Sequence, residues 1–130
     1  MLVAGAVAAA VSGAPSTGYA LVHGDDPLTA TLAAGSLLLP EEKRRRRLLI
    51  AAVPVHLGIS LFWAAVLERA LPSRRRVVWG TAAGVAIGVL DLIVVGRRLP
   101  RVRALPLAPQ LADHALFGAT VGLVLARKEA

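Results

Sequence analysis

The hydrophobic residues of this chain occur in long stretches, and the charged residues are gathered in short blocks between them. An apolar stretch of about 20 residues is long enough to cross the roughly 30 Å hydrocarbon core of a bilayer as an α-helix. The pattern predicts about four such spans, at residues 2–22, 48–71, 77–96 and 105–126. We therefore expect an all-α fold, a polytopic membrane helical bundle that forms a single integral membrane domain over residues 1–130.

A shorter apolar stretch, residues 27–39, follows a polar turn. Asp26 is expected to be its N-cap and Pro27 its first helical residue. The helix would be roughly 20 Å long, which is too short to cross the hydrocarbon core, so it is predicted to be re-entrant or interfacial. Pro40 is expected to open the next helix, with the two glutamates after it in the first turn, where carboxylates suit the helix dipole.

The first predicted span contains Pro15, Ser16 and Thr17, and we expect a kink there. Proline removes one backbone hydrogen bond, and a neighbouring hydroxyl can satisfy the freed carbonyl inside a bilayer. A cleaved signal peptide is the alternative interpretation of residues 2–22. It is less favoured because no Lys or Arg precedes the apolar run and no clean small-x-small cleavage site follows it.

Composition supports a membrane protein and excludes some chemistry. Hydrophobic residues make up 56% of the chain, and the mean hydropathy is +0.66. The chain has no cysteine, which excludes a disulfide framework, thiolate chemistry and an iron–sulfur site. Metal binding would have to rest on histidine and carboxylate.

The basic residues are sorted to the two sides of the predicted bundle. Nine of the 15 lie at residues 43–47 and 97–103, and the other six lie on the opposite side. The positive-inside rule then places the side with nine charges in the cytoplasm and both termini outside, unless residues 27–39 cross the bilayer. The arginines expected to contact anionic lipid headgroups are Arg44, Arg45, Arg46, Arg47, Arg97 and Arg98. No nucleic-acid partner is expected, because no folded basic surface with interleaved aromatic residues is present.

Two predicted spans carry glycine at helical spacing. The residues are Gly80, Gly84 and Gly88 in the third span and Gly118 and Gly122 in the fourth. Small residues on one face let helix backbones approach closely in a membrane, so we expect these faces to pack. Asp91 lies about 20° from Gly84 around the helix and is expected to meet protein on the same face, since a carboxylate facing lipid is costly.

Polar side chains inside the predicted spans lie at similar depths, roughly 8 to 14 Å from the side with nine basic residues. They are His56, Asp91, Gln110, Asp113 and His114. A hydrogen-bonded cluster of His56, Asp91 and His114 is the expected arrangement. Asp91 then has two possible roles: a protonatable group or ion ligand, or a structural contact between helices. The histidines are either a proton relay or hydrogen-bonded residues of the bundle core. No metal site or cofactor is predicted, because no two histidines have the four-residue spacing of a helical metal site.

Two segments carry a family resemblance: the residues from Ser12 to Thr17 followed by Asp26 and Pro27, and the residues from Leu105 to His114 followed by Phe117 and Gly118. Together they resemble small, uncharacterised bacterial inner-membrane proteins with four helices. The resemblance implies the fold and a multi-pass location in the bacterial inner membrane, and it implies no activity. The chain is also similar in size to small multidrug transporters, but their essential glutamate lies in the first helix, which has no acid here.

Three functions fit these observations. The favoured one is a structural or accessory membrane protein that packs with itself as a homo-oligomer or with a larger membrane partner. The alternative is a proton- or cation-linked small transporter or channel that uses Asp91 with His56 and His114. The third is a membrane-embedded lipid enzyme with Asp113 and His114 as acid or base. An enzyme is not expected, because no phosphate loop, nucleophile elbow or zinc-protease helix is present.

Overall fold

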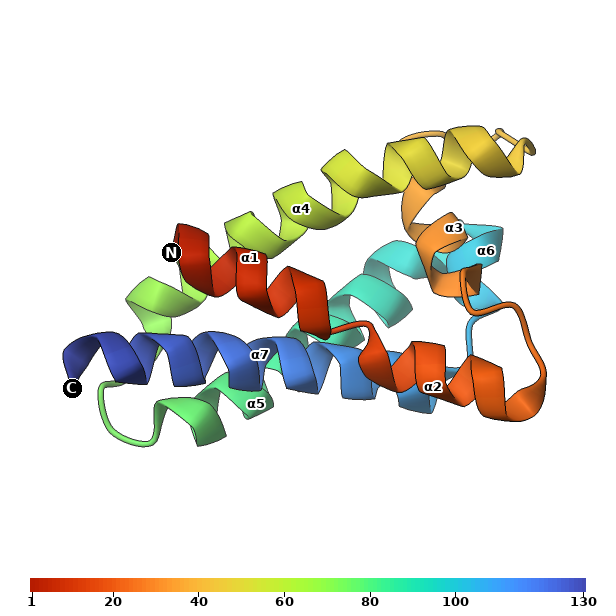
Figure 1. The fold of residues 1–130 in the computed structure, drawn as a ribbon. Coiled ribbons are helices and arrows are strands. Elements are labelled where there is room, and N and C mark those ends of the chain that lie inside the picture. Colours follow the sequence, from red (N-terminus) through yellow and green to blue (C-terminus); the bar gives the residue numbers. More distant parts are fainter.

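The computed structural model describes residues 1–130 and consists of helices joined by turns and loops, with no strand. Its elements are α1 (Leu2–Val11), α2 (Ala14–His23), α3 (Thr29–Gly35), α4 (Arg45–Ala70), α5 (Arg76–Val89), the π-helical η1 (Leu90–Val95), the 3₁₀ turn η2 (Gly96–Arg98), α6 (Pro100–Arg103) and α7 (Leu107–Glu129) (Figure 1). The all-α prediction is confirmed. Two helical runs, Arg45–Ala70 and Arg76–Arg98, are long and apolar enough to cross a membrane.

The first predicted span is two helices and not one kinked helix. α1 ends at Val11, and α2 begins at Ala14 with Pro15 in its first turn. The break therefore lies at Ser12 and Gly13, ahead of the predicted kink. The physical reason is that Pro15 has no N–H to give to the preceding turn, whereas its fixed φ suits the start of a new helix.

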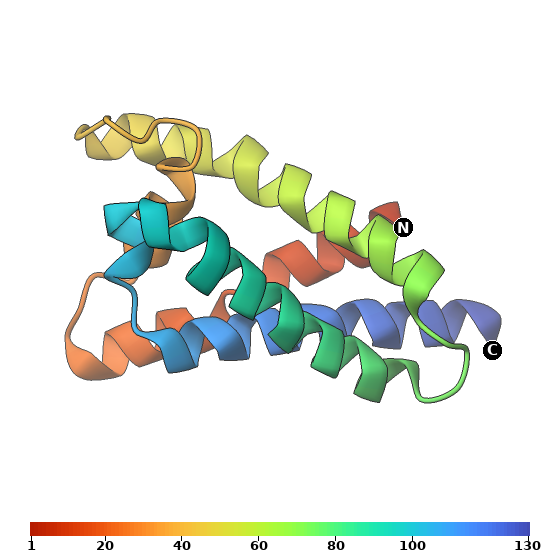
Figure 2. The same cartoon turned by 180° about the vertical axis from the view of Figure 1, so that it is seen from behind.

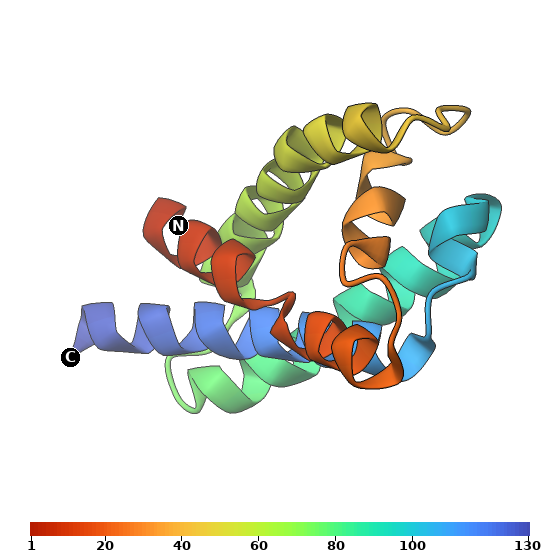
Figure 3. The same ribbon diagram turned by 45° about the vertical axis from the view of Figure 1, so that its right-hand side comes forward.

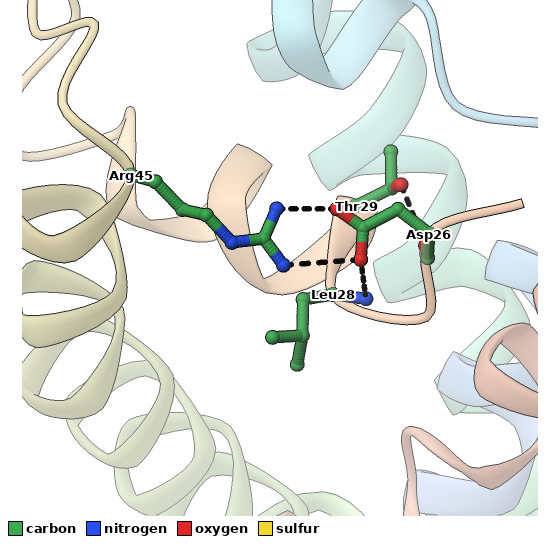
Figure 4. A network of polar contacts seen from close by, with 4 residues as sticks. All are labelled: Asp26, Leu28, Thr29 and Arg45. Atoms are coloured by element: carbon green, nitrogen blue, oxygen red, sulfur yellow. Dashed lines mark hydrogen bonds and ion pairs between the residues drawn. The ribbon is translucent and has the colours of Figure 1, made fainter.

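The segment after α2 contains a shorter helix than predicted. The Asp26 carboxylate accepts a hydrogen bond from the backbone N–H of Leu28 at 2.9 Å, and the backbone carbonyl of Asp26 accepts one from the Thr29 hydroxyl at 2.7 Å (Figure 4). This Asx-type turn delays the helix, so that α3 starts at Thr29 and spans seven residues, about 10 Å. Asp26 also forms an ion pair with Arg45, which ties the turn to the first residue of α4.

The prediction that a helix begins at Pro40 is wrong. α4 begins at Arg45, because the Glu42 carboxylate accepts the backbone N–H groups of Lys43 and Arg44 at 3.0 and 2.9 Å. These local hydrogen bonds compete with helix formation just before α4. The helix then runs for 26 residues, and Leu71 is extended because the next residue is a proline.

The helices form a bundle with two distinct ends. Both chain termini and the α4–α5 turn lie at one end, which we call the terminal end, and α3, α6 and the α2–α3 turn lie at the other, the turn end (Figures 1 and 3). α5 and α7 run antiparallel side by side and make the most extensive helix contact (Figure 2). α1 packs against both α4 and α7, and α2 packs against α7.

The hydrophobic core lies in the half of the bundle nearer the terminal end. Its buried residues come from α1, from α4 and its C-cap, and from α5 and α7; they are Ala4, Ala8, Ala64, Leu67, Leu71, Ile87, Phe117, Val121 and Leu125. Two ion pairs close the same end: the Met1 amino group lies 3.0 Å from the Glu68 carboxylate, and Arg76 lies 2.6 Å from Glu129. The terminal end is thus the closed end of the bundle.

The Asp26–Arg45 ion pair gives a prediction for acidic pH. The hydrogen bonds from Arg45 and from the Leu28 N–H lower the pKa of the Asp26 carboxyl from 3.8 to about 2. Because the folded-state pKa is lowered, the pair stabilises the turn above pH about 4, and this contribution is lost as the pH falls toward about 2. A carboxyl ¹³C titration in detergent micelles should show a midpoint near 2 for Asp26. In the Arg45→Gln variant the midpoint should move up toward 3.8, and an unchanged midpoint would contradict the role of the pair.

Candidate functional site

The contact between α5 and α7 positions the central polar residues. A Cβ atom built at Gly80 would overlap the carbonyl of Gly118, and one built at Gly118 would overlap the carbonyl of Gly80. A Cβ at Gly84 would overlap the carbonyl of His114, and one at Gly88 would lie 3.0 Å from the His114 side chain. The glycine faces thus bring the two backbones together and set His114 against the end of α5.

Asp91 follows directly after this contact and lies in η1, where the helix widens to the π form. The backbone N–H of Gly96 donates to the carbonyl of Asp91, five residues earlier, which is the hydrogen-bond spacing of a π-helix. Single turns of π-helix are frequent at functional sites because they redirect one side chain of a helix. Here the Oδ2 atom of Asp91 lies 3.5 Å from Nε2 of His114.

The hydrogen bonds of His114 fix how the pair holds protons. Its Nδ1 lies 2.8 Å from the carbonyl oxygen of Gln110, and because a carbonyl can only accept, Nδ1 carries a proton. Nε2 therefore meets Asp91 either as an N–H or as a bare lone pair. The pair is neutral when one proton lies between Nε2 and the carboxylate, and it carries one negative charge when that proton leaves.

His56 and Asp113 have a different role: they form hydrogen bonds with backbone groups that the break between α1 and α2 leaves free. His56 Nε2 lies 2.8 Å from the carbonyl of Ala9, one of the free carbonyls at the end of α1, and donates to it. The Asp113 carboxylate accepts the backbone N–H of Ser16, in the first turn of α2, at 2.8 Å. Two side chains from other helices thus pair backbone groups that the break leaves without helical partners. The predicted hydrogen bonds of His56 with Asp91 and His114 are therefore wrong.

The predicted polar residues nevertheless surround one cavity. It has a volume of about 390 Å³, and His56, Asp91, Gln110, Asp113 and His114 all line it. We call it the central cavity. Fifteen of its 23 lining residues are hydrophobic, so an apolar chamber holds a few acidic and imidazole groups. The five residues were predicted to lie at similar depth, and they line one cavity in the structure. The cavity itself was not predicted.

Two further polar residues of the central cavity were not predicted. Ser12 and Ser60 are buried, line the cavity and make no side-chain hydrogen bond within the chain. Ser60 lies one turn after His56 and so on the same face of α4, which is the signal that could have identified it. The signal for Ser12 is weaker, because only the position of the helix break brings it to the cavity.

A second cavity of about 310 Å³ adjoins the first near the turn end, and we call it the outer cavity. Asp25, Asp26, Tyr19 and Thr29 line it. Three residues line both cavities and form the boundary between them: Ala30, Leu105 and Gln110. Gln110 is 7% exposed, and its side chain makes no hydrogen bond within the chain.

Acidic and basic side chains are distributed unequally around the two cavities. The chain contains eight acidic residues, and all of its aspartates line a cavity: Asp25 and Asp26 the outer one, and Asp91 and Asp113 the central one. None of the 15 lysines and arginines lines either cavity. Both cavities are therefore lined by acidic and not by basic side chains in a protein whose net charge is +7, although Asp26 is paired with Arg45 and Asp91 lies beside His114.

The arginines expected to contact lipid headgroups lie at the turn end, in the segments around the start of α4 and in η2. Two of them are engaged within the chain, Arg45 with Asp26 and Arg47 with Glu42 at 3.3 Å. Arg44, Arg46, Arg97 and Arg98 are exposed. No group of three or more His, Asp or Glu side chains lies close enough to hold a metal ion.

Comparison with known proteins adds no further information about the site. No protein-family model matches the chain, and neither a curated protein nor a solved structure is similar to it at a significant level. The resemblance of residues 12–17 and 105–114 to small bacterial membrane proteins remains an expectation from sequence. The function must therefore be argued from the cavities.

Proposed function

We propose that the protein is a small multi-pass membrane transporter or channel that binds a cation in the central cavity and exchanges it with protons. Asp91 and His114 are the titratable pair in this proposal. The observation that carries it is the sorting of charge: every aspartate of the chain lines a cavity, and no lysine or arginine does. A site for an anion or for a lipid phosphate would be expected to present basic groups.

A membrane location is supported by the surface of the two candidate spans. Only 22% of the most apolar window of each is buried inside the protein, whereas the core helix of a soluble protein would be mostly buried. The remaining hydrophobic side chains face outward, as lipid-facing helices require. In our proposal α7 and the broken pair α1–α2 complete a bundle of four spans. The sequence resemblance implies that the membrane is the bacterial inner membrane.

The distribution of hydrogen bonds favours this function over a purely structural one. His56 and Asp113 form hydrogen bonds with backbone groups at the helix break, and these contacts explain their positions. No such backbone contact explains Asp91, whose carboxylate meets only the ring of His114 across the cavity. The glycine faces of α5 and α7 pack against each other, so they do not supply an outward face for a partner protein.

The proposal is tested by transport in liposomes. Purified protein should release a proton gradient, reported by an internal pH-sensitive dye, when a small organic cation is added outside. The Asp91→Asn variant preserves shape but cannot titrate, and it should lose the flux. The Glu41→Gln variant removes an exposed carboxylate that lies outside both cavities, and it should transport like the wild type. Equal flux from wild type and Asp91→Asn would contradict the proposal.

A further inference from the structure

We infer that the outer cavity is the entrance to the central cavity, and that it admits small organic cations from the turn end only. This inference rests on the proposed function and names its substrate class and route. The ligand expected is a positively charged ammonium group attached to a small apolar body. The inference depends on three features: the shared wall of the cavities, their charge, and the closed terminal end.

The shared wall consists of one small, one apolar and one polar side chain, those of Ala30, Leu105 and Gln110. Ala30 adds only a methyl group, and the side chain of Gln110 lines both cavities without a hydrogen-bond partner in the chain. Gln110 is 7% exposed as a residue, but its amide nitrogen and oxygen are not fully buried, so they can bind water or a ligand in the cavities. An amide free to bond on either side of the boundary is suited to a passing ligand. Gln110 therefore marks the junction of the route.

The chemistry of both chambers selects a cation. The outer cavity presents the Asp25 carboxylate and the Tyr19 hydroxyl, whose oxygen atoms can accept a hydrogen bond from a positive group. The Asp26 carboxylate also lines this cavity, but it is paired with Arg45. The central cavity combines two carboxylates with mostly hydrophobic walls and a volume of about 390 Å³. That volume is far larger than a bare metal ion needs. It suits an ammonium group that carries apolar substituents.

The opposite end of the central cavity is closed by the hydrophobic core. Trp63, Ile87 and Phe117 line the cavity and also belong to the core or pack against it. Beyond them Val121 and Ala64 are 0% exposed. Of its two ends, the central cavity is therefore closed toward the terminal end, as one of the two states of an alternating-access cycle requires. Its side is not sealed within the chain, since exposed residues such as Val53 line it, and in our proposal this side faces lipid.

The test uses the absence of cysteine in the chain, which allows single-cysteine labelling without background. Ser60→Cys places a thiol in the central cavity, and Ala64→Cys places one in the core one turn further along α4. Arg46→Cys and Lys128→Cys report which membrane face is the turn end and which is the terminal end. Vesicles are treated with a membrane-impermeant cationic methanethiosulfonate and with an anionic one of similar size.

We expect the Ser60→Cys thiol to react from the turn-end face, at least about tenfold faster with the cationic reagent than with the anionic one. The Ala64→Cys thiol should not react from either face. Gln110→Leu, combined with Ser60→Cys, should slow the reaction, because it removes the polar group at the junction. If Ser60→Cys folds poorly, Ala30→Cys at the boundary of the cavities reports on the same route.

Equal rates with the two reagents, or reaction from the terminal-end face, would overturn the inference. Absence of reaction from both faces, while the denatured protein reacts fully, would also overturn it. Labelling does not depend on transport, so the two proposals fail separately. Selective labelling without proton-coupled flux would contradict only the proposed function, whereas flux with terminal-end labelling would contradict only the entrance.

Discussion

The Gly118→Ala variant is expected to be less stable than the wild type by about 1–3 kcal/mol or more, although only one methyl group is added. A Cβ at Gly118 would overlap the carbonyl of Gly80 and would lie 2.9 Å from the backbone nitrogen of Gly84. Backbone atoms cannot turn aside as the end of a flexible side chain can. The α5–α7 contact must therefore open, and this contact also sets His114 beside Asp91.

The measurement is the thermal unfolding midpoint in detergent, followed by size-exclusion chromatography of heated samples. Gly58→Ala is the matched control, because Gly58 is also a glycine inside a helix, and an added Cβ there would meet nothing within 4 Å. That substitution should be neutral or stabilising, since alanine favours a helix over glycine. If Gly118→Ala and Gly58→Ala had the same unfolding midpoint, the close approach of α5 and α7 would be contradicted.

The long apolar elements of this fold could be predicted from hydrophobic pattern alone. The third predicted span, 77–96, lies within the run Arg76–Arg98, and the fourth, 105–126, begins two residues before α7 (Leu107–Glu129) and otherwise lies within it. The errors fall where local hydrogen bonds decide the outcome. Glu42 binds the amides that follow it and delays α4, and α6 was not predicted at all, because it is a short turn of helix that begins at Pro100. Such elements carry no hydrophobic periodicity.

The polar residues around the central cavity were predictable by type and depth, but not by partner. His56 was expected to bond Asp91 and His114, and it bonds the carbonyl of Ala9 instead. That carbonyl is free only because the chain breaks at Ser12 and Gly13, and the exact place of the break determines which groups need a partner. The outer cavity could not be predicted either, since tertiary packing alone brings Asp25 and Gln110 to the lining of one cavity.

The Asp113→Ala variant is expected to lose about 1–3 kcal/mol of stability, because it leaves the backbone N–H of Ser16 without an acceptor inside the bundle. The Asp113→Asn variant retains an amide oxygen at the same position, so it can still accept this hydrogen bond, which measures 2.8 Å in the wild type. It should keep nearly the wild-type unfolding midpoint. The comparison separates the hydrogen bond of Asp113 from its charge, because only the alanine variant removes the acceptor.

The same pair of variants distinguishes the two inner aspartates. If Asp113 acts through its hydrogen bond, Asp113→Asn should retain most of the cation-driven proton flux, whereas Asp91→Asn should remain folded and lose it. Loss of flux in both asparagine variants, with both still folded, would show that Asp113 also acts through its charge. Equal stability of Asp113→Ala and Asp113→Asn would contradict the role of Asp113 at the α1–α2 break. In that case the Ser16 N–H must have another acceptor, since the Ser16 hydroxyl acts as a donor instead, to the carbonyl of Gly13 at 3.3 Å.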